Sequence, residues 1–408
     1  MKPSRPTRLT SSTGETGPAE PRSAPEIVSN VAGSFAWRVL HERHPALISQ
    51  VRHAHPYQPR QLRALDRLLQ EIRSGQIPPL PATAHDRAQW DNWGSFAGQR
   101  WADVPFLWAE SYFYRCLLDA VDFFEPGPWL RLDPFGPMKD AELSAGGFAD
   151  DLRVFNGTHA LTAPERVRAL LTASVWGNQA DLGFRVGAAT TERPVGEIGR
   201  LVANDLDTAC SMLHTGRRLP KVGVVADNAG RELLSDLLLV DHLVETGLAN
   251  HVAIHVKPHP YYVSDAVTAD VVNCLRRLNA SEGSAGDAGR RLWSAMRSGR
   301  VTVETHGYYC APLPFHEMPP ALAADLASTS LVLLKGDLNY RRLVGDRAWP
   351  STTSFRQASA YFPAPVVALR TLKSDVVLGL DAGTVSTLEA SGQAWRTSGR
   401  YGLVQARR

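Results

Sequence analysis

The segment from residue 221 to residue 244 restricts the fold more than any other feature of the sequence. Val222 to Ala226 is apolar and rich in β-branched residues, which predicts a short strand buried on both faces. Asp227 and Asn228 follow this run directly. From Leu233 onward, apolar residues recur at helical spacing. The order strand, polar turn, helix is the repeating unit of α/β folds, in which ligands bind at the carboxyl ends of the strands.

The same alternation continues to near residue 370. Further apolar runs predict strands at residues 251–256, 301–304, 331–334 and 366–369, and amphipathic patterns predict helices at residues 201–214 and 267–278. A stretch rich in glycine and serine, residues 281–289, predicts a loop. We therefore expect an α/β fold with a mostly parallel sheet in a three-layer α/β/α sandwich.

The first 182 residues have a different character. Residues 1–26 are rich in proline, serine, threonine, glycine and charge, which predicts a disordered tail. Residues 27–182 form a mainly helical domain in this interpretation, with helices over 62–72, over 104–124 and from a capping box at Thr162 to Val175. Residues 183–405 then form the α/β domain.

Composition narrows the class of protein. The chain has 408 residues, and its 44 basic and 41 acidic residues leave a net charge of +3, which does not favour a nucleic-acid-binding protein. No apolar run is long enough to span a membrane, and the N-terminus lacks the apolar core of a signal peptide. The four cysteines are widely spaced, as expected for reduced thiols in the cytoplasm.

Polar side chains follow four of the predicted strands. In a parallel sheet these carboxyl ends lie on one edge, so the side chains should converge. Carboxylate and amide oxygens suit Mg²⁺ or Mn²⁺, and nearby lysine and arginine suit a phosphate. Each residue taken alone also has a simple explanation as a helix cap, a turn residue or a solvated charge. The convergent set is Asp227, Asn228, Asp265, Lys335, Asp337, Asn339, Arg370 and Lys373.

Four ordered motifs resemble a known family. They are Asp-Asn-x-Gly-x-Glu at 227–232, Val-Ser-Asp at 263–265, Lys-Gly-Asp-Leu-Asn-Tyr-Arg at 335–341 and Arg-Thr-x-Lys at 370–373. Together they resemble the damage-control phosphatase family, specifically the subfamily marked by Arg-Thr-x-Lys, which has also been described as protein-glutamate carboxyl methyltransferase-like. Shorter similar segments begin at Trp101, so the resemblance covers roughly residues 101–373.

The resemblance implies a metal-dependent phosphatase that acts on small phosphorylated metabolites, including hexose phosphates such as fructose 1-phosphate. It implies that Asp227, Asn228 and Asp265 hold the catalytic metal, Mn²⁺ first, with Ni²⁺, Co²⁺ or Mg²⁺ as alternatives. The family motifs and the charged residues at the strand ends together give the expected substrate-binding residues. These are Glu232, Lys335, Asp337, Leu338, Asn339, Tyr340, Arg341, Arg370 and Lys373.

Two other functions are also compatible with the sequence. One is a protein-glutamate carboxyl methyltransferase that uses S-adenosylmethionine, although no Gly-x-Gly turn follows the first predicted strand. The other is a non-catalytic ligand-binding protein that keeps the fold. Within the phosphatase hypothesis, Asp227 or Asp337 is the candidate to orient or deprotonate a water molecule, and an aspartyl-phosphate intermediate is an alternative.

Overall fold

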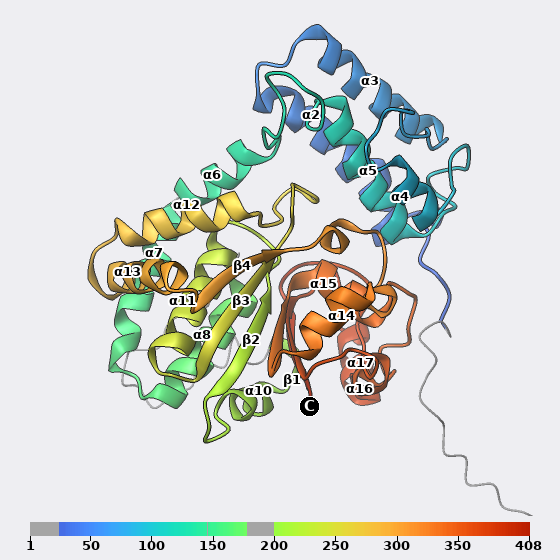
Figure 1. Cartoon of the computed structure of the whole chain (residues 1–408). Coiled ribbons are helices and arrows are strands. Elements are labelled where there is room, and N and C mark those ends of the chain that lie inside the picture. The colour runs from blue at the N-terminus through green and yellow to red at the C-terminus, as the bar shows by residue number, and fades with distance from the viewer. Residues whose placement is uncertain (1–23, 145, 178–199) are drawn as a thin grey trace, which may run out of the picture.

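A seven-stranded sheet forms the centre of the molecule, as the computed structural model shows (Figure 1). The structure describes residues 24–144, 146–177 and 200–408. The strand order across the sheet is β1-β7-β6-β5-β2-β3-β4. The strands are β1 Leu201–Asn204, β2 Leu219–Val225, β3 Ala249–Val256, β4 Val301–Thr305, β5 Leu331–Lys335, β6 Val366–Thr371 and β7 Gly402–Arg407.

Five neighbouring strands, from β6 to β4, run parallel to one another. β7 is antiparallel to β6, and β1 is parallel to β7. These two strands therefore form one edge of the sheet and run opposite to the other five. Val225 at the end of β2 pairs with His255 of β3 and Leu334 of β5. The carboxyl ends of the three central strands therefore lie level, and the residues that follow them meet at one edge.

Helices cover both faces of the sheet, which confirms the predicted three-layer α/β/α architecture. Val224 points into one apolar cluster and Val225 into another, as the alternation along a strand requires. The first cluster contains residues of α7 Gly146–Gly157, α8 Ala163–Trp176, α10 Leu206–Leu213, α11 Arg231–Glu245, α12 Thr268–Asn279 and α13 Gly283–Arg297. The second contains residues of α14 Pro320–Ala327, α15 Gly336–Val344 and α16 Phe355–Ala358, with α17 Ala382–Ala390 packed beside it.

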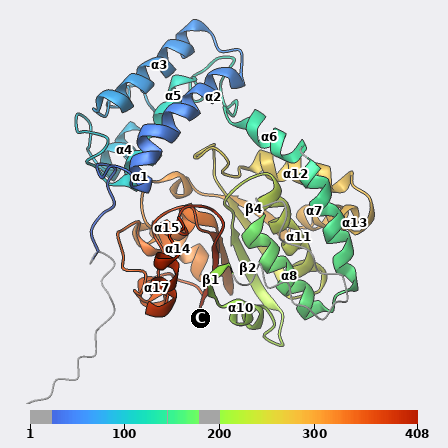
Figure 2. The same cartoon turned by 180° about the vertical axis from the view of Figure 1, so that it is seen from behind.

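The N-terminal helices form a lobe with its own apolar cluster, which stands beyond one end of the sheet (Figures 1 and 2). Its helices are α1 Phe35–Arg38, a π-helix at Val39–Arg43, α2 His44–Ala54, α3 Pro59–Ser74, α4 Arg87–Trp93 and α5 Phe106–Ala120. α6 Gly136–Ser144 leads from this lobe to the α/β part. Within the described residues, no helix has the length and apolar character needed to cross a membrane.

The predicted N-terminal helices are confirmed as α3, α5 and α8, and the capping box of Thr162 and Glu165 is present at the start of α8. The domain limits stay predictions. The limit near residue 182 lies outside the described residues, and α7 and α8, before it, share one apolar cluster with the sheet. Residues 1–23 also lie outside the described part, whereas Glu26, which the predicted tail includes, pairs with Arg347.

Two local predictions were wrong. Residues 201–214, predicted as one helix, form β1 and then α10, because residues 201–204 pair with β7, whose position cannot be read from local periodicity. Residues 281–289, predicted as a loop, include the first half of α13. A β-carbon at Gly289 would lie 2.6 Å from the backbone nitrogen of Asn279. This glycine therefore allows α13 to pack closely on α12 and does not mark a loop.

Candidate active site

Backbone hydrogen bonds join the turn after β2 to the loop after β3. Asn228 forms an antiparallel β-bridge with Asp265, and the N–H of Ala266 donates to the carbonyl of Asp227 at 2.8 Å. Gly230, with a φ of +72°, then turns the chain into α11. The three predicted metal ligands thus lie side by side, although Asp265 is distant in sequence.

The amide of Asn228 is oriented by three neighbours. Its Nδ2 donates to Asp227 Oδ2 at 2.9 Å and to Glu232 Oε2 at 2.8 Å. Its Oδ1 accepts a hydrogen bond from the Ser264 hydroxyl at 2.5 Å. A carbonyl oxygen has a second lone pair, so Oδ1 remains able to act as a ligand in this orientation.

Negative charge is concentrated in the buried turn. Burial raises the pKa of Asp227 well above its usual range, and the neighbouring carboxylates of Glu232 and Asp265 raise it further. Burial also raises the pKa of Asp265, while Lys257, whose ammonium lies 3.9 Å from Asp265 Oδ2, acts in the opposite direction. A bound cation would relieve the repulsion among these carboxylates.

These residues fit a divalent cation. Two carboxylates and an amide oxygen are the hard donors that Mn²⁺ and Mg²⁺ take in proteins. Within the described part of the chain, no group of three or more His, Cys, Asp or Glu side chains is arranged to hold a metal. The fit therefore depends on Asn228 as the third donor beside Asp227 and Asp265.

Lys335, which ends β5, is paired inside the protein. Its ammonium lies 3.2 Å from Glu232 Oε1 and 2.9 Å from Asp236 Oδ1, and its side chain is 1% exposed. Burial raises the pKa of Asp236 to about 6, although Lys335 opposes this shift. Burial would also raise the pKa of Glu232, but Lys335 and Lys373 bring it below its usual value. The Lys335 ammonium is thus paired with two carboxylates of α11.

The Arg-Thr-x-Lys motif folds around Asp337. This carboxylate accepts hydrogen bonds from Arg370 Nε at 2.9 Å, from the Lys373 N–H at 3.0 Å and from the Ser374 hydroxyl at 3.1 Å. Burial opposes ionisation, but Arg370 holds the pKa of Asp337 below its usual value. Arg370 also stacks over the Tyr340 ring at 4.4 Å. Lys373 is half-buried, and its ammonium has no ion pair within 4 Å among the described residues.

The remaining members of the predicted substrate set are buried. Asn339 donates from Nδ2 to the carbonyls of Ala226 and Lys335 at 3.1 and 2.9 Å, and its Oδ1 has no partner among the described atoms. Leu338 belongs to a small apolar cluster, and the Tyr340 hydroxyl donates to Gln405 at 2.9 Å. These contacts hold α15 against the sheet.

Arg341 connects α15 to the helical lobe. Its guanidinium lies 2.9 Å from Glu110 of α5 and 2.7 Å from Asp346, and it covers the Phe106 ring at 4.7 Å. Because both carboxylates are themselves buried, this pairing leaves Arg341 engaged within the protein. Among the predicted substrate residues, Lys373 is therefore the cation with an ammonium available to a ligand.

Sequence reasoning missed two charged residues that α6 brings to the site. Lys139 donates to the carbonyl of Asp265 at 2.9 Å, to Asp133 at 2.8 Å and to Asp270 at 2.9 Å. Glu142 lies against Gly230 at the start of α11. Both follow the Asp-Pro-Phe segment at 133–135, and their spacing of three residues on a helix is the signal that could have identified them.

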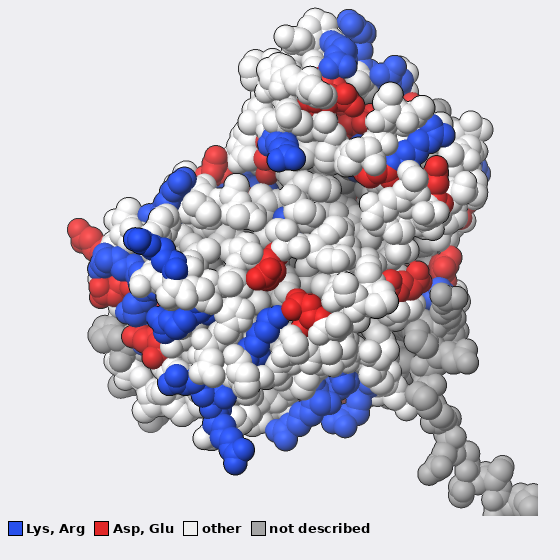
Figure 3. Space-filling view, viewed as in Figure 1, with Lys and Arg blue, Asp and Glu red and all other residues white. Residues whose placement is uncertain are grey.

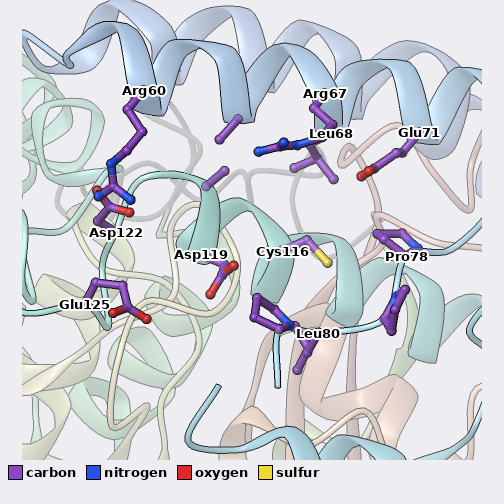
Figure 4. Close-up of a pocket in the computed structure, with 14 residues that line it drawn as sticks. Arg60, Arg67, Leu68, Glu71, Pro78, Leu80, Cys116, Asp119, Asp122 and Glu125 are labelled. Atoms are coloured by element: carbon purple, nitrogen blue, oxygen red, sulfur yellow. The ribbon is translucent and has the colours of Figure 1, made fainter. Parts of the chain in front are cut away.

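A cavity of about 400 Å³ lies in the helical lobe, between α3 and α5 (Figure 4). Arg60 and Arg67 reach it from α3, Cys116 and Asp119 from α5. None of the predicted site residues lines this cavity. On the face seen in Figure 3, side chains of both charges are interspersed over the lobe and the α/β part.

The cluster of oxygen donors lies at the carboxyl edge of the parallel sheet, where α/β proteins bind their ligands, and its buried carboxylates with shifted pKa values are typical of an enzyme site. The model of the damage-control phosphatase ARMT1-like domain matches residues 39–388. The chain therefore belongs to the damage-control phosphatase family, which confirms the resemblance seen in the motifs. Membership of this family makes the protein a phosphatase.

Full-length relatives agree with this assignment. The chain is 29% identical to the mouse damage-control phosphatase ARMT1 and 26% identical to the human one, and each alignment covers 91% of this chain and 96% of the relative.

A crystal structure of a DUF89 family protein from Pyrococcus horikoshii aligns with a TM-score of 0.46 and 14% identity, covering 87% of this chain and 93% of that one.

Proposed function

We propose that this protein is a divalent-metal-dependent phosphatase that hydrolyses small phosphorylated metabolites in the cytoplasm, with hexose phosphates such as fructose 1-phosphate among its substrates. Asp227, Asn228 and Asp265 would hold Mn²⁺, with Ni²⁺, Co²⁺ or Mg²⁺ as alternatives. The observation that carries the proposal is the pairing of Asn228 with Asp265, which joins three oxygen donors from two loops in one buried cluster.

The metal would supply positive charge for the phosphoryl oxygens and lower the pKa of a bound water. The protein's own residues would bind the phosphate, position the binding lysine and balance the buried charge. Lys373 would hold the phosphate by a charge-assisted hydrogen bond. Asp337 would position Lys373, because it accepts the Lys373 N–H and holds Arg370 in the same segment. Lys335 would balance the charge of Glu232 and Asp236 beneath the site.

The test is phosphate release by the full chain after metal removal and after addition of Mn²⁺, with fructose 1-phosphate and p-nitrophenyl phosphate as substrates. We expect activity only with metal. Asp227→Ala and Asp265→Ala should lose nearly all activity while remaining folded, because each removes a ligand together with its charge. Asp287→Asn, a change at an exposed ion pair, is the matched control.

Full activity after verified metal removal would contradict the proposal, as would near-normal turnover in either aspartate variant. A parallel assay with S-adenosylmethionine and a protein carboxylate tests the methyltransferase alternative. Methyl transfer without phosphate release would favour that alternative, and binding of phosphorylated sugars without either reaction would favour a non-catalytic binding protein.

A further inference from the structure

α6 presents two charged side chains to the two segments that carry the proposed metal ligands, the turn after β2 and the loop after β3. In Figures 1 and 2 this helix lies beside α12, between the lobe and the α/β part. Lys139 and Glu142 are three residues apart and so lie on one side of the helix. Lys139 reaches the carbonyl of Asp265 in the loop after β3, and Glu142 lies against Gly230 in the turn after β2.

The carboxylate of Glu142 lies directly over Gly230. A β-carbon at Gly230 would overlap both Glu142 oxygens, and the φ of +72° also favours glycine at this position. The N–H of Arg231 donates to the carboxylate, while the Arg231 guanidinium is held away by Asp151 at 2.5 and 2.6 Å. The local backbone therefore fixes the position of Glu142.

Glu142 also lies in the electrostatic field of the proposed phosphate site. Burial raises the pKa of Glu142 and Glu232 raises it further, whereas Arg231 and Lys373 lower it. Glu142 is half-buried, and among the described residues it has no ion pair within 4 Å. It is thus a carboxylate at the site that neither holds the metal in the proposed arrangement nor is neutralised by a direct partner.

We propose that Glu142 determines specificity by contacting the alcohol part of the substrate: it accepts hydrogen bonds from hydroxyl groups and repels leaving groups that carry a negative charge. The inference rests on the proposed phosphatase function. It makes Glu142 the residue that favours phosphate monoesters of neutral, polyhydroxylated alcohols over esters with an acidic leaving group.

The expected selectivity follows from the properties of the Glu142 carboxylate. An ionised carboxylate is only an acceptor, and its two oxygens suit a pair of neighbouring hydroxyls. Hydrogen bonds to an ionised acceptor are stronger than those between neutral groups. A negatively charged leaving group at the same place would meet a like charge, and discrimination by repulsion is a common source of specificity.

The experiment compares three esters with the Mn²⁺-loaded full chain: fructose 1-phosphate, p-nitrophenyl phosphate and phosphoglycolate. The variants are Glu142→Ala and Glu142→Gln, with Asp140→Asn, an exposed change on the same helix, as control. We expect Glu142→Ala to raise the KM for fructose 1-phosphate about tenfold and to leave p-nitrophenyl phosphate within about twofold. Glu142→Gln should raise kcat/KM for phosphoglycolate about tenfold relative to the other two esters.

An equal change for all three esters would overturn the inference, because Glu142 would then act only as a cap for α11. If Glu142→Ala does not fold, the selectivity of Glu142→Gln alone decides. If the wild-type chain hydrolyses none of the esters with Mn²⁺, the proposed function itself fails, and this result is distinct from a wild-type enzyme whose selectivity does not depend on Glu142.

Discussion

At the scale of single residues, burial and pairing separate lysines that look alike in the sequence. Lys335 and Lys373 both follow predicted strands and both belong to family motifs. In the folded chain, Lys335 lies between two buried carboxylates, whereas Lys373 is half-buried and has no ion pair within 4 Å among the described residues. The two residues should therefore respond differently to substitution.

Replacing Lys373 by alanine should weaken the binding of phosphorylated substrates and leave the fold intact. Loss of one charge-assisted contact costs roughly 1.5 to 3 kcal/mol, which is about one to two orders of magnitude in affinity. Substrate kinetics, a calorimetric Mn²⁺ titration and thermal unfolding of Lys373→Ala are the measurements. Unchanged kinetics with lower stability would make Lys373 structural. Lys221→Ala, at an ion pair on the surface, is the control.

Replacing Lys335 by methionine should instead destabilise the fold. The change leaves Glu232 and Asp236 buried without their shared cation, and breaking a buried pair in this way costs about 3 to 5 kcal/mol. Chemical denaturation of Lys335→Met beside Lys221→Met measures the difference, because the exposed pair of Lys221 should contribute less than about 1 kcal/mol. Equal stability of the two variants would contradict this role.

At the scale of elements, local patterns predicted the strands that carry the site and missed the helix that supports it. The β2 strand, the turn at Asp227 and helix α11 follow from neighbouring residues alone. The approach of α6 does not, because Lys139 and the carbonyl of Asp265 are 126 residues apart. Arg370 shows the same limit: its position in a strand end was predictable, but its pairing with Asp337 depends on how β5 and β6 pair.

Replacing Lys139 by methionine should lower the affinity for Mn²⁺. Lys139 holds the backbone of a proposed metal ligand, and loss of such a supporting contact typically costs 10- to 100-fold in metal affinity. Calorimetric titration of Mn²⁺ into folded Lys139→Met, Lys139→Arg and wild-type protein is the measurement. Arginine keeps the charge and should recover part of the affinity. Identical titrations of Lys139→Met and wild-type protein would exclude this role.

At the scale of the whole molecule, the helical lobe and the α/β part meet through buried charge. Arg341 of α15 pairs with Glu110 of α5, and Tyr262 from the loop after β3 donates to the same carboxylate at 3.1 Å. The sequence predicted two regions of different composition. It did not indicate this contact, because the partners are 231 residues apart. The lobe is therefore connected to the loop that bears Asp265.

The pH dependence of stability offers a test of the core of the lobe. His44 is buried, its ring stacks on Phe113 at 3.7 Å, and neither ring nitrogen has a partner among the described atoms. Burial lowers the pKa of His44 well below the ordinary value of 6.5, and Arg43 adds to this effect. The folded protein therefore keeps His44 neutral at a pH where the unfolded chain binds a proton.

The difference in proton binding between the folded and the unfolded chain determines how stability changes with pH. The stability linked to a neutral His44 is fully present above pH 6.5 and is lost as the pH falls below 6.5, by about 1.4 kcal/mol per pH unit. His44→Phe removes the proton-binding group and keeps an aromatic ring, so its free energy of unfolding should fall less steeply between pH 6.5 and 5. Denaturation at several pH values measures the slopes, with His53→Gln, an exposed change on the same helix, as control. Parallel slopes for His44→Phe and wild-type protein would show that His44 is protonated in the folded lobe as readily as in the unfolded chain.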